Sequence, residues 1–171
     1  MGPEGSHLRR IRTDAYVEYP AWSPDGTRIA FMGGTSAGEY DIWVVDTDGS
    51  NLTRLTDSPG PDGWPAWSPD GTRVAFSSVR DDATARMLRT ARPPATSGRI
   101  TTSGSSTRTG QGLSRVTPES GQFMTWSPDG EYLLVSGYDL YVIRPDNTGR
   151  APLDLEGLRG GLFPDWIDPD P

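Results

Sequence analysis

Three features of the sequence contain residue types that could do chemistry, and the first matches a nucleophile motif. Residues 34–38 (Gly-Thr-Ser-Ala-Gly) fit the Gly-x-Ser-x-Gly pattern of hydrolases, in which the serine attacks the substrate. That serine works only on a tight strand-to-helix turn, with an acid and a histidine nearby. The only histidine, His7, lies close to the N-terminus. We therefore expect residues 34–38 to form a flexible loop between two strands, and we predict no enzymatic activity.

The second feature is an acidic stretch that could bind a cation. Residues 46–51 (Asp-Thr-Asp-Gly-Ser-Asn) are similar to the start of a calcium loop, in which oxygen ligands alternate along a turn. A complete calcium loop also needs a distal carboxylate that binds through both oxygens, and none stands at the expected offset. We interpret these residues as a hairpin turn built on Asp-Gly, and we predict neither a metal nor another cofactor.

The third feature is an aromatic residue three positions before each of four tryptophans. These aromatic residues are Tyr19, Trp64, Phe123 and Phe163. Aromatic side chains on a ring around a common axis could bind a peptide or a loop of a protein partner, so all four are candidate binding residues. They could equally pack between neighbouring sheets, and this interpretation is favoured because apolar residues are usually structural.

The four tryptophans belong to an internal repeat. Residues 20–28 (Pro-Ala-Trp-Ser-Pro-Asp-Gly-Thr-Arg) recur at 65–73, in a shorter form at 125–130, and in a degenerate form at 163–170. Successive tryptophans are 45, 59 and 40 residues apart, close to the ~40–50 residues of a four-stranded propeller blade. Ser-Pro-Asp-Gly predicts a type I turn, with proline at its second position and glycine at its fourth.

Each repeat unit predicts four short strands. The first strand ends on the tryptophan, and apolar residues alternate in the second strand after the turn. Residues 41–45 are apolar on both faces, as expected for a strand between two packed sheets, and 52–55 supply the fourth strand. The predicted fold class is all-β, a partial β-propeller of about three four-stranded antiparallel blades in an incomplete ring. The blades span approximately 17–57, 62–117 and 121–156 of a single segment 1–171, and 157–171 begin a further repeat.

These motifs resemble the TolB-type, WD-like β-propeller repeat. The resemblance rests on Trp-Ser-Pro-Asp-Gly before an apolar strand, on residues 40–49 (Tyr-Asp-Ile-Trp-Val-Val-Asp-Thr-Asp-Gly) and on 52–56 (Leu-Thr-Arg-Leu-Thr). It implies a non-enzymatic scaffold that binds a protein or peptide partner, often in the bacterial envelope. Similar propellers cap prolyl-oligopeptidase-type peptidases, so the alternative function is a severed gating domain of such a serine peptidase. Residues 1–10 have no apolar core of a secretory signal, and the sequence leaves the compartment open.

Charge and composition narrow the choice of partner. The 171 residues carry a net charge of -7, with 23 acidic residues and 16 arginines, so we expect no nucleic-acid partner. No stretch approaches the ~20 apolar residues of a spanning helix, and we expect no membrane insertion. Closed propellers have ~4–8 blades. We therefore expect a fragment of a longer propeller, and the alternative is a homodimer of three-blade halves.

One segment, 83–110, departs from the repeat. It contains five of the 16 arginines and no acidic residue, and 100–110 (Ile-Thr-Thr-Ser-Gly-Ser-Ser-Thr-Arg-Thr-Gly) replace the expected third strand of the second unit. The codons of 100–110 can also be read in a shifted frame, in which the third base of each codon is joined to the first two bases of the next. If common Ser and Arg codons are assumed, this frame permits the string Tyr-Asp-Ile-Trp-Val-Val-Asp-Thr-Asp-Gly. This string is identical to residues 40–49. We infer a compensated frameshift, entered soon after Asp82 and left at Gly110, and we expect the translated segment to be disordered or poorly packed.

Overall fold

β-strand is the only regular secondary structure in the part of the chain that the computed structural model describes. Among these residues no helix has the length and apolar character that crossing a membrane requires. The described residues are 10–11, 13, 16–36, 39–57, 59–79, 87–93, 111–117, 123–136, 140–146, 148–149 and 151–152. The strands are β1 (Tyr16–Trp22), β2 (Arg28–Ser36), β3 (Glu39–Asp46), β4 (Thr53–Arg54), β5 (Asp62–Trp67), β6 (Val74–Ser78), β7 (Met87–Arg92), β8 (Gln111–Thr117), β9 (Phe123–Trp126), β10 (Leu133–Ser136), β11 (Leu140–Ile143) and β12 (Ala151–Pro152).

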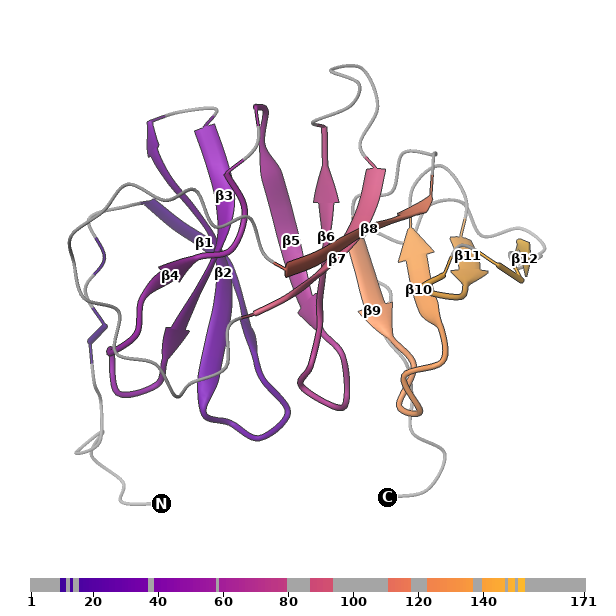
Figure 1. The fold of residues 1–171 in the computed structure, drawn as a ribbon, viewed down its shortest axis with the longest axis horizontal. Coiled ribbons are helices and arrows are strands. Elements are labelled where there is room, and N and C mark those ends of the chain that lie inside the picture. The colour runs from indigo at the N-terminus through magenta and orange to yellow at the C-terminus, as the bar shows by residue number, and fades with distance from the viewer. Residues whose placement is uncertain are drawn as a thin grey trace.

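The strands form three four-stranded antiparallel sheets that stand side by side (Figure 1). In each sheet the strands pair in chain order: β1 to β4 in the first sheet, β5 to β8 in the second and β9 to β12 in the third. The described strands do not close into a ring. The predicted fold class, an all-β partial propeller with an incomplete ring, is confirmed.

A tight turn follows the repeat tryptophan in all three sheets, as the sequence predicts. The backbone N–H of Gly26 donates to the carbonyl oxygen of Ser23 at 2.9 Å, and the equivalent bonds in the second and third sheets are both 2.8 Å. Gly26 has φ of 69°, in the left-handed region that favours glycine. The Asp25 carboxylate accepts a hydrogen bond from the Ser23 hydroxyl at 2.6 Å and one from the Thr27 N–H at 3.1 Å. The turn is therefore stabilised by side-chain as well as backbone hydrogen bonds.

The hydrophobic core lies between the sheets, because both faces of the second sheet are covered. Along β6, Val74 and Phe76 pack in a cluster with Ile42 of the first sheet. Ala75, which points to the opposite face, belongs to a second cluster with Leu133 of the third sheet. Burial of each large side chain contributes ~1.5–3 kcal/mol. The faces that neighbouring sheets turn toward each other are thus buried by packing between the sheets.

The same inter-sheet junction occurs twice among the described residues. The indole Nε1 of Trp67 donates to the carbonyl oxygen of Ala21 at 3.1 Å, and the guanidinium carbon of Arg28 lies 4.7 Å from the centroid of that indole. Between the second and third sheets, Trp126 Nε1 donates to the Ala66 carbonyl oxygen at 3.1 Å, and the guanidinium carbon of Arg73 lies 4.6 Å from the ring centroid. The repeat thus specifies how neighbouring sheets join as well as how each one folds.

The third strand of the second sheet, β7, lies inside the anomalous segment. The sequence predicts 100–110 in the place of this strand, whereas the upstream residues Met87–Arg92 form it. The expectation that 100–110 are disordered or poorly packed stays a prediction. Arg89 stands opposite Phe76, the place that Trp43 has opposite Phe31 in the first sheet. The backbone N–H and C=O groups of β6 and β8 need hydrogen-bond partners whatever side chains lie between them. The residues between these strands therefore form β7 although it contains Arg89 and Arg92. Residues 100–110 lie outside the described part of the chain.

Candidate functional site

Three of the four predicted aromatic residues contact one another across the sheets. The ring centroids of Tyr19 and Trp64 are 5.4 Å apart with a tilt of 44°, and those of Trp64 and Phe123 are 5.5 Å apart with an edge-to-face angle of 78°. We call these three residues the aromatic row. Both geometries are favourable for aromatic pairs. Tyr19 is 43% exposed, and the other two side chains are half-buried. Phe163 lies outside the described residues.

Two members of the aromatic row are held in an unusual backbone conformation. Tyr19 has φ of 50° and Trp64 has φ of 53°, although neither is glycine. Each lies at a β-bulge, where the pairing of β1 with β2 shifts between Glu18 and Ala21 and that of β5 with β6 shifts between Gly63 and Ala66. Left-handed aromatic residues cost ~1–3 kcal/mol, and such strain concentrates at functional sites.

The bulges were not predicted from the sequence, although a signal for them was present. Pro20 follows Tyr19 and Pro65 follows Trp64 in the middle of their strands. Proline lacks an N–H to donate to the ladder, so within a sheet it is restricted to edges and bulges. Phe123 is followed by Met124 instead, and the pairing of β9 with β10 is continuous. A proline inside a first strand could therefore have indicated the strained aromatic residues.

A buried carboxylate lies in the first sheet at the end where the first strands begin. Asp41 is 6% exposed and forms a salt bridge with Arg54. It also accepts a hydrogen bond from the Thr56 hydroxyl at 3.2 Å, and that hydroxyl in turn accepts one from the Ile42 N–H at 3.0 Å. Burial raises the pKa of Asp41 above its ordinary value despite Arg54, and the charge of Asp62 acts in the same direction.

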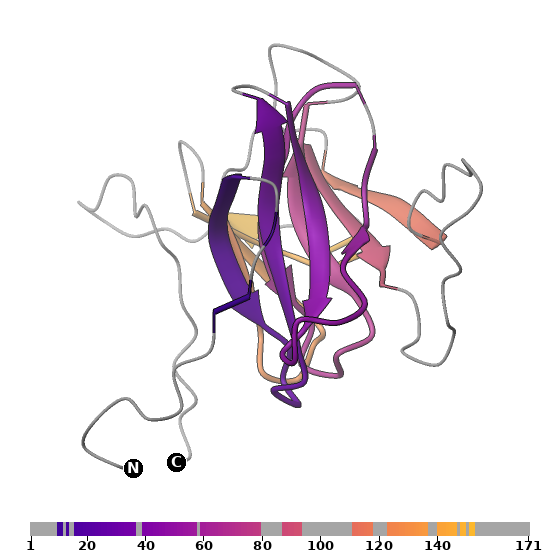
Figure 2. The same ribbon diagram turned by 90° about the vertical axis from the view of Figure 1, so that its left-hand side faces the viewer.

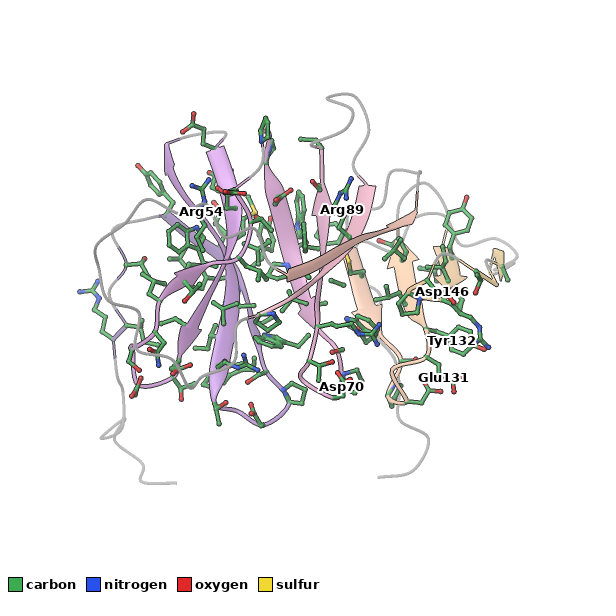
Figure 3. All side chains as sticks on the ribbon, viewed as in Figure 1. Arg54, Asp70, Arg89, Glu131, Tyr132 and Asp146 are labelled. Atoms are coloured by element: carbon green, nitrogen blue, oxygen red, sulfur yellow. The ribbon has the colours of Figure 1, made fainter. Side chains whose placement is uncertain are left out.

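Two charged residues of the second sheet lie at this same end. Asp62 is fully buried two positions before Trp64, and Arg89 is 8% exposed. Figure 3 shows Arg54 and Arg89 at one end of the sheets, whereas Asp70 of the turn after Trp67 lies at the opposite end. The aromatic row therefore lies at an end of the sheets that also contains buried charges. Such an end can stack against and hydrogen-bond a polypeptide.

The stretch that matches a nucleophile motif lies in a β-hairpin. Gly34 and Ser36 belong to β2 and pair with Tyr40 and Glu39 of β3. The prediction of a flexible loop over residues 34–38 is therefore wrong for 34–36, because the antiparallel ladder continues through them. A Cβ at position 34 would overlap the backbone of Glu39, so glycine permits this close approach.

The acidic stretch 46–51 connects β3 to β4 as the predicted turn. The N–H of Gly49 donates to the carbonyl oxygen of Asp46 at 2.8 Å, and Gly49 has φ of 83°. The Asn51 side-chain amide donates to the Asp46 carboxylate at 2.6 Å. Within the described part of the chain, no group of three or more His, Cys, Asp or Glu side chains is placed to hold a metal ion.

A family model described as TolB beta propeller domain matches residues 11–136, which include the strands of the first two sheets and the start of the third. The chain belongs to the TolB beta propeller domain family. No curated protein matches the chain in sequence.

Solved structures share the fold of this TolB propeller domain. A putative TolB from Agrobacterium tumefaciens is similar at a TM-score of 0.67 and 22% identity, over 88% of this chain and 52% of that protein. TolB from Acinetobacter baumannii has a TM-score of 0.57 and 19% identity, over 79% of this chain and 31% of that one. A prolyl endopeptidase has a TM-score of 0.58 and 19% identity, over 81% and 22% respectively. The chain thus spans about half the length of the Agrobacterium protein and less of the other two.

Proposed function

We propose that this TolB propeller domain is a non-enzymatic scaffold that binds a protein or peptide through the aromatic row. The observation that carries the proposal is the contact of Tyr19, Trp64 and Phe123, one from each sheet, with the first two held at positive φ. Packing alone does not require strained backbone, since Phe123 joins the row without a bulge. Aromatic residues whose rings are partly exposed are the usual anchors of protein interfaces.

Selection of a peptide ligand from a displayed random library tests the proposal. We expect the selected peptide to bind the wild-type chain, and Trp64→Ala to weaken binding by more than about tenfold while the chain stays folded. Trp22→Ala is the matched control, because Trp22 is an exposed aromatic residue of β1 outside the row, and it should bind as tightly as the wild type. A large loss of stability in Trp64→Ala with unchanged binding would support a packing role instead.

A second candidate function is the propeller gate of a prolyl-oligopeptidase-type serine peptidase. The similarity to a prolyl endopeptidase favours it, since the match covers 81% of this chain and only 22% of that protein. The nucleotides on either side of the coding region distinguish the two functions. A downstream hydrolase sequence with its own Ser, Asp and His would support the gate, and further Trp-Ser-Pro-Asp-Gly repeats would support the scaffold.

A further inference from the structure

Tyr19 and Trp64 contact each other although no backbone ladder joins their strands. β1 belongs to the first sheet and β5 to the second. Figure 2 shows the first sheet in front of the others, and β2 of that sheet packs against β5. The ring centroids of Tyr19 and Trp64 are nevertheless only 5.4 Å apart. Side chains between the two sheets therefore set the spacing of these rings.

Met32 connects the two strands that carry the rings. It belongs to β2, is 6% exposed, and pairs with Glu18, the residue before Tyr19. Its sulfur lies against Gly63, the residue before Trp64. A Cβ placed on Gly63 would be only 2.8 Å from Met32 Sδ, and 3.9 Å from both Cγ and Cε of the same side chain. One thioether thus links the residues that precede the two aromatic residues.

Gly63 is required here for space and not for its backbone conformation. It is buried, and it is not among the glycines with positive φ, so its backbone does not demand glycine. A side chain at this position would instead overlap the sulfur of Met32. Methionine is unbranched and polarizable, so it fills irregular gaps of this kind. The contact therefore combines a long side chain on β2 with none on β5.

This contact lies directly before both β-bulges. Regular pairing of β1 with β2 continues to Glu18, and regular pairing of β5 with β6 continues to Gly63. Tyr19 and Trp64, both at positive φ, follow immediately. Met32 therefore holds the last regularly paired residue of each strand at one level, just where the two strained aromatic residues begin.

We propose that Met32 is a positioning residue of the aromatic row. Its thioether, seated on Gly63, holds β1 and β5 at the separation at which the rings of Tyr19 and Trp64 are in contact. A surface whose rings are already in place loses less conformational entropy when a ligand binds, so the contact also favours peptide affinity. That last step rests on the proposed function, whereas the positioning of the rings does not.

Nuclear Overhauser effects between the Tyr19 and Trp64 rings of the full chain test the proposal, together with the affinity for the peptide selected from the displayed library. Met32→Ala removes the thioether, and Gly63→Val places a branched side chain where the sulfur lies. We expect each variant to lose the ring contacts and to weaken peptide binding by at least about fivefold. Either variant alone tests the contact if the other does not fold.

Two further variants should keep both the ring contacts and the peptide affinity. Met32→Leu replaces the thioether by an apolar side chain of similar volume. The double variant Met32→Ala, Gly63→Val has as many side-chain heavy atoms as the wild type, and the side chain added on β5 fills the space that the thioether leaves on β2. Recovery in the double variant would show that the two positions are coupled.

Val74→Ala is the matched control for a merely structural role. Val74 is fully buried between the first and second sheets, but it pairs with Trp67 at the other end of β5. Its truncation should lower stability and leave the ring contacts and the peptide affinity unchanged. Ring contacts that persist in Met32→Ala, that are lost equally in Val74→Ala, or that do not return in the double variant would overturn the proposal.

The two readouts separate this proposal from the proposed function. Lost ring contacts with unchanged peptide affinity in Met32→Ala would contradict peptide binding by the aromatic row and support the positioning role. Weakened affinity with intact ring contacts would contradict the positioning role and leave the proposed function standing.

Discussion

The indole N–H of Trp67 in the second sheet donates to the carbonyl oxygen of Ala21 in the first sheet at 3.1 Å, across 46 positions of sequence. This bond joins two sheets that share no backbone ladder. The guanidinium of Arg28 covers the same indole, so one side chain contributes a hydrogen bond and a cation–π contact to the junction.

The first prediction concerns this junction. Trp67→Phe removes the hydrogen bond and weakens the cation–π contact, and we expect it to lower the free energy of unfolding by about 1–3 kcal/mol. Urea unfolding measures the change. Trp22→Phe is the control, because the same residue type in the same repeat position is 63% exposed, and in dilute solution it should cost less than about 0.5 kcal/mol. Equal losses in both variants would contradict a role for the junction.

The second prediction concerns acid stability. A hydrogen bond from Ser23, with another from the Thr27 N–H, lowers the pKa of Asp25 to about 2. Burial raises the pKa of Asp70, but hydrogen bonds from Ser68 and Thr72 outweigh it and lower that pKa to about 2 as well. Because the pKa is depressed in the folded state, the stabilisation is complete above the ordinary value of 3.8 and is lost as pH falls towards about 2.

Urea midpoints measured across this pH range check the acid-stability prediction. The double variant Asp25→Asn, Asp70→Asn should lose less stability between pH 3.8 and about 2 than the wild type, because it has no such carboxylates to protonate. An unchanged slope in the double variant would refute the assignment.

The third prediction concerns the buried carboxylate of the first sheet. Arg54→Met leaves Asp41 buried without its ion-pair partner, and we expect a loss of about 1–2 kcal/mol at neutral pH, discounted because the Arg54 side chain is 46% exposed. The substitution should raise the pKa of Asp41 further. A raised pKa stabilises the fold below it and the effect disappears as pH rises, so the deficit of the variant should shrink in acid. Arg54→Lys, which keeps the charge, should lose less, and a deficit independent of pH would exclude this explanation.

The fourth prediction separates backbone strain from aromatic contact at Trp64. Both Trp64→Ala and Trp64→Gly remove the ring, but only glycine adopts a φ of 53° without steric cost. We expect the glycine variant to be more stable than the alanine variant by about 1 kcal/mol in urea unfolding. The same pair at Phe123, which has no positive φ, should show the reverse order, because glycine weakens a regular strand. A less stable Trp64→Gly would mean that the strain is not present in solution.

The fifth prediction concerns the inferred frameshift. The codons of residues 100–110 should spell Tyr-Asp-Ile-Trp-Val-Val-Asp-Thr-Asp-Gly when they are read one frame over. Sequencing the gene decides this directly, and codons that are incompatible with the string would end the hypothesis.

Replacing residues 87–93 by the sequence of 41–47 should stabilise the chain. The replacement exchanges Arg89, which stands opposite Phe76, for tryptophan, and this is the pairing found in the first sheet.

Much of the candidate site was visible in the sequence as spacing but not as geometry. The interval of three residues to each repeat tryptophan identified Tyr19, Trp64 and Phe123, and the structure brings their rings into contact. The sequence pattern does not indicate the positive φ of two of them, because the residues around Pro20 and Pro65 predict regular strands. The buried charges at Asp41 and Asp62 were also missed, since single polar residues in an apolar strand carry no signal until their neighbours are known.

The fold class and the turns were determined by the sequence alone, because both depend on local chemistry. A Ser-Pro-Asp-Gly turn and an apolar alternation act over a few residues, and their recurrence at intervals of 40 to 59 residues specifies repeated sheets. Tertiary structure decided which residues form the third strand of the second sheet, which rings touch and which tryptophan stays exposed. These features depend on neighbours 40 or more residues away, such as Ala21 for Trp67, and packing between sheets rather than local preference selects them.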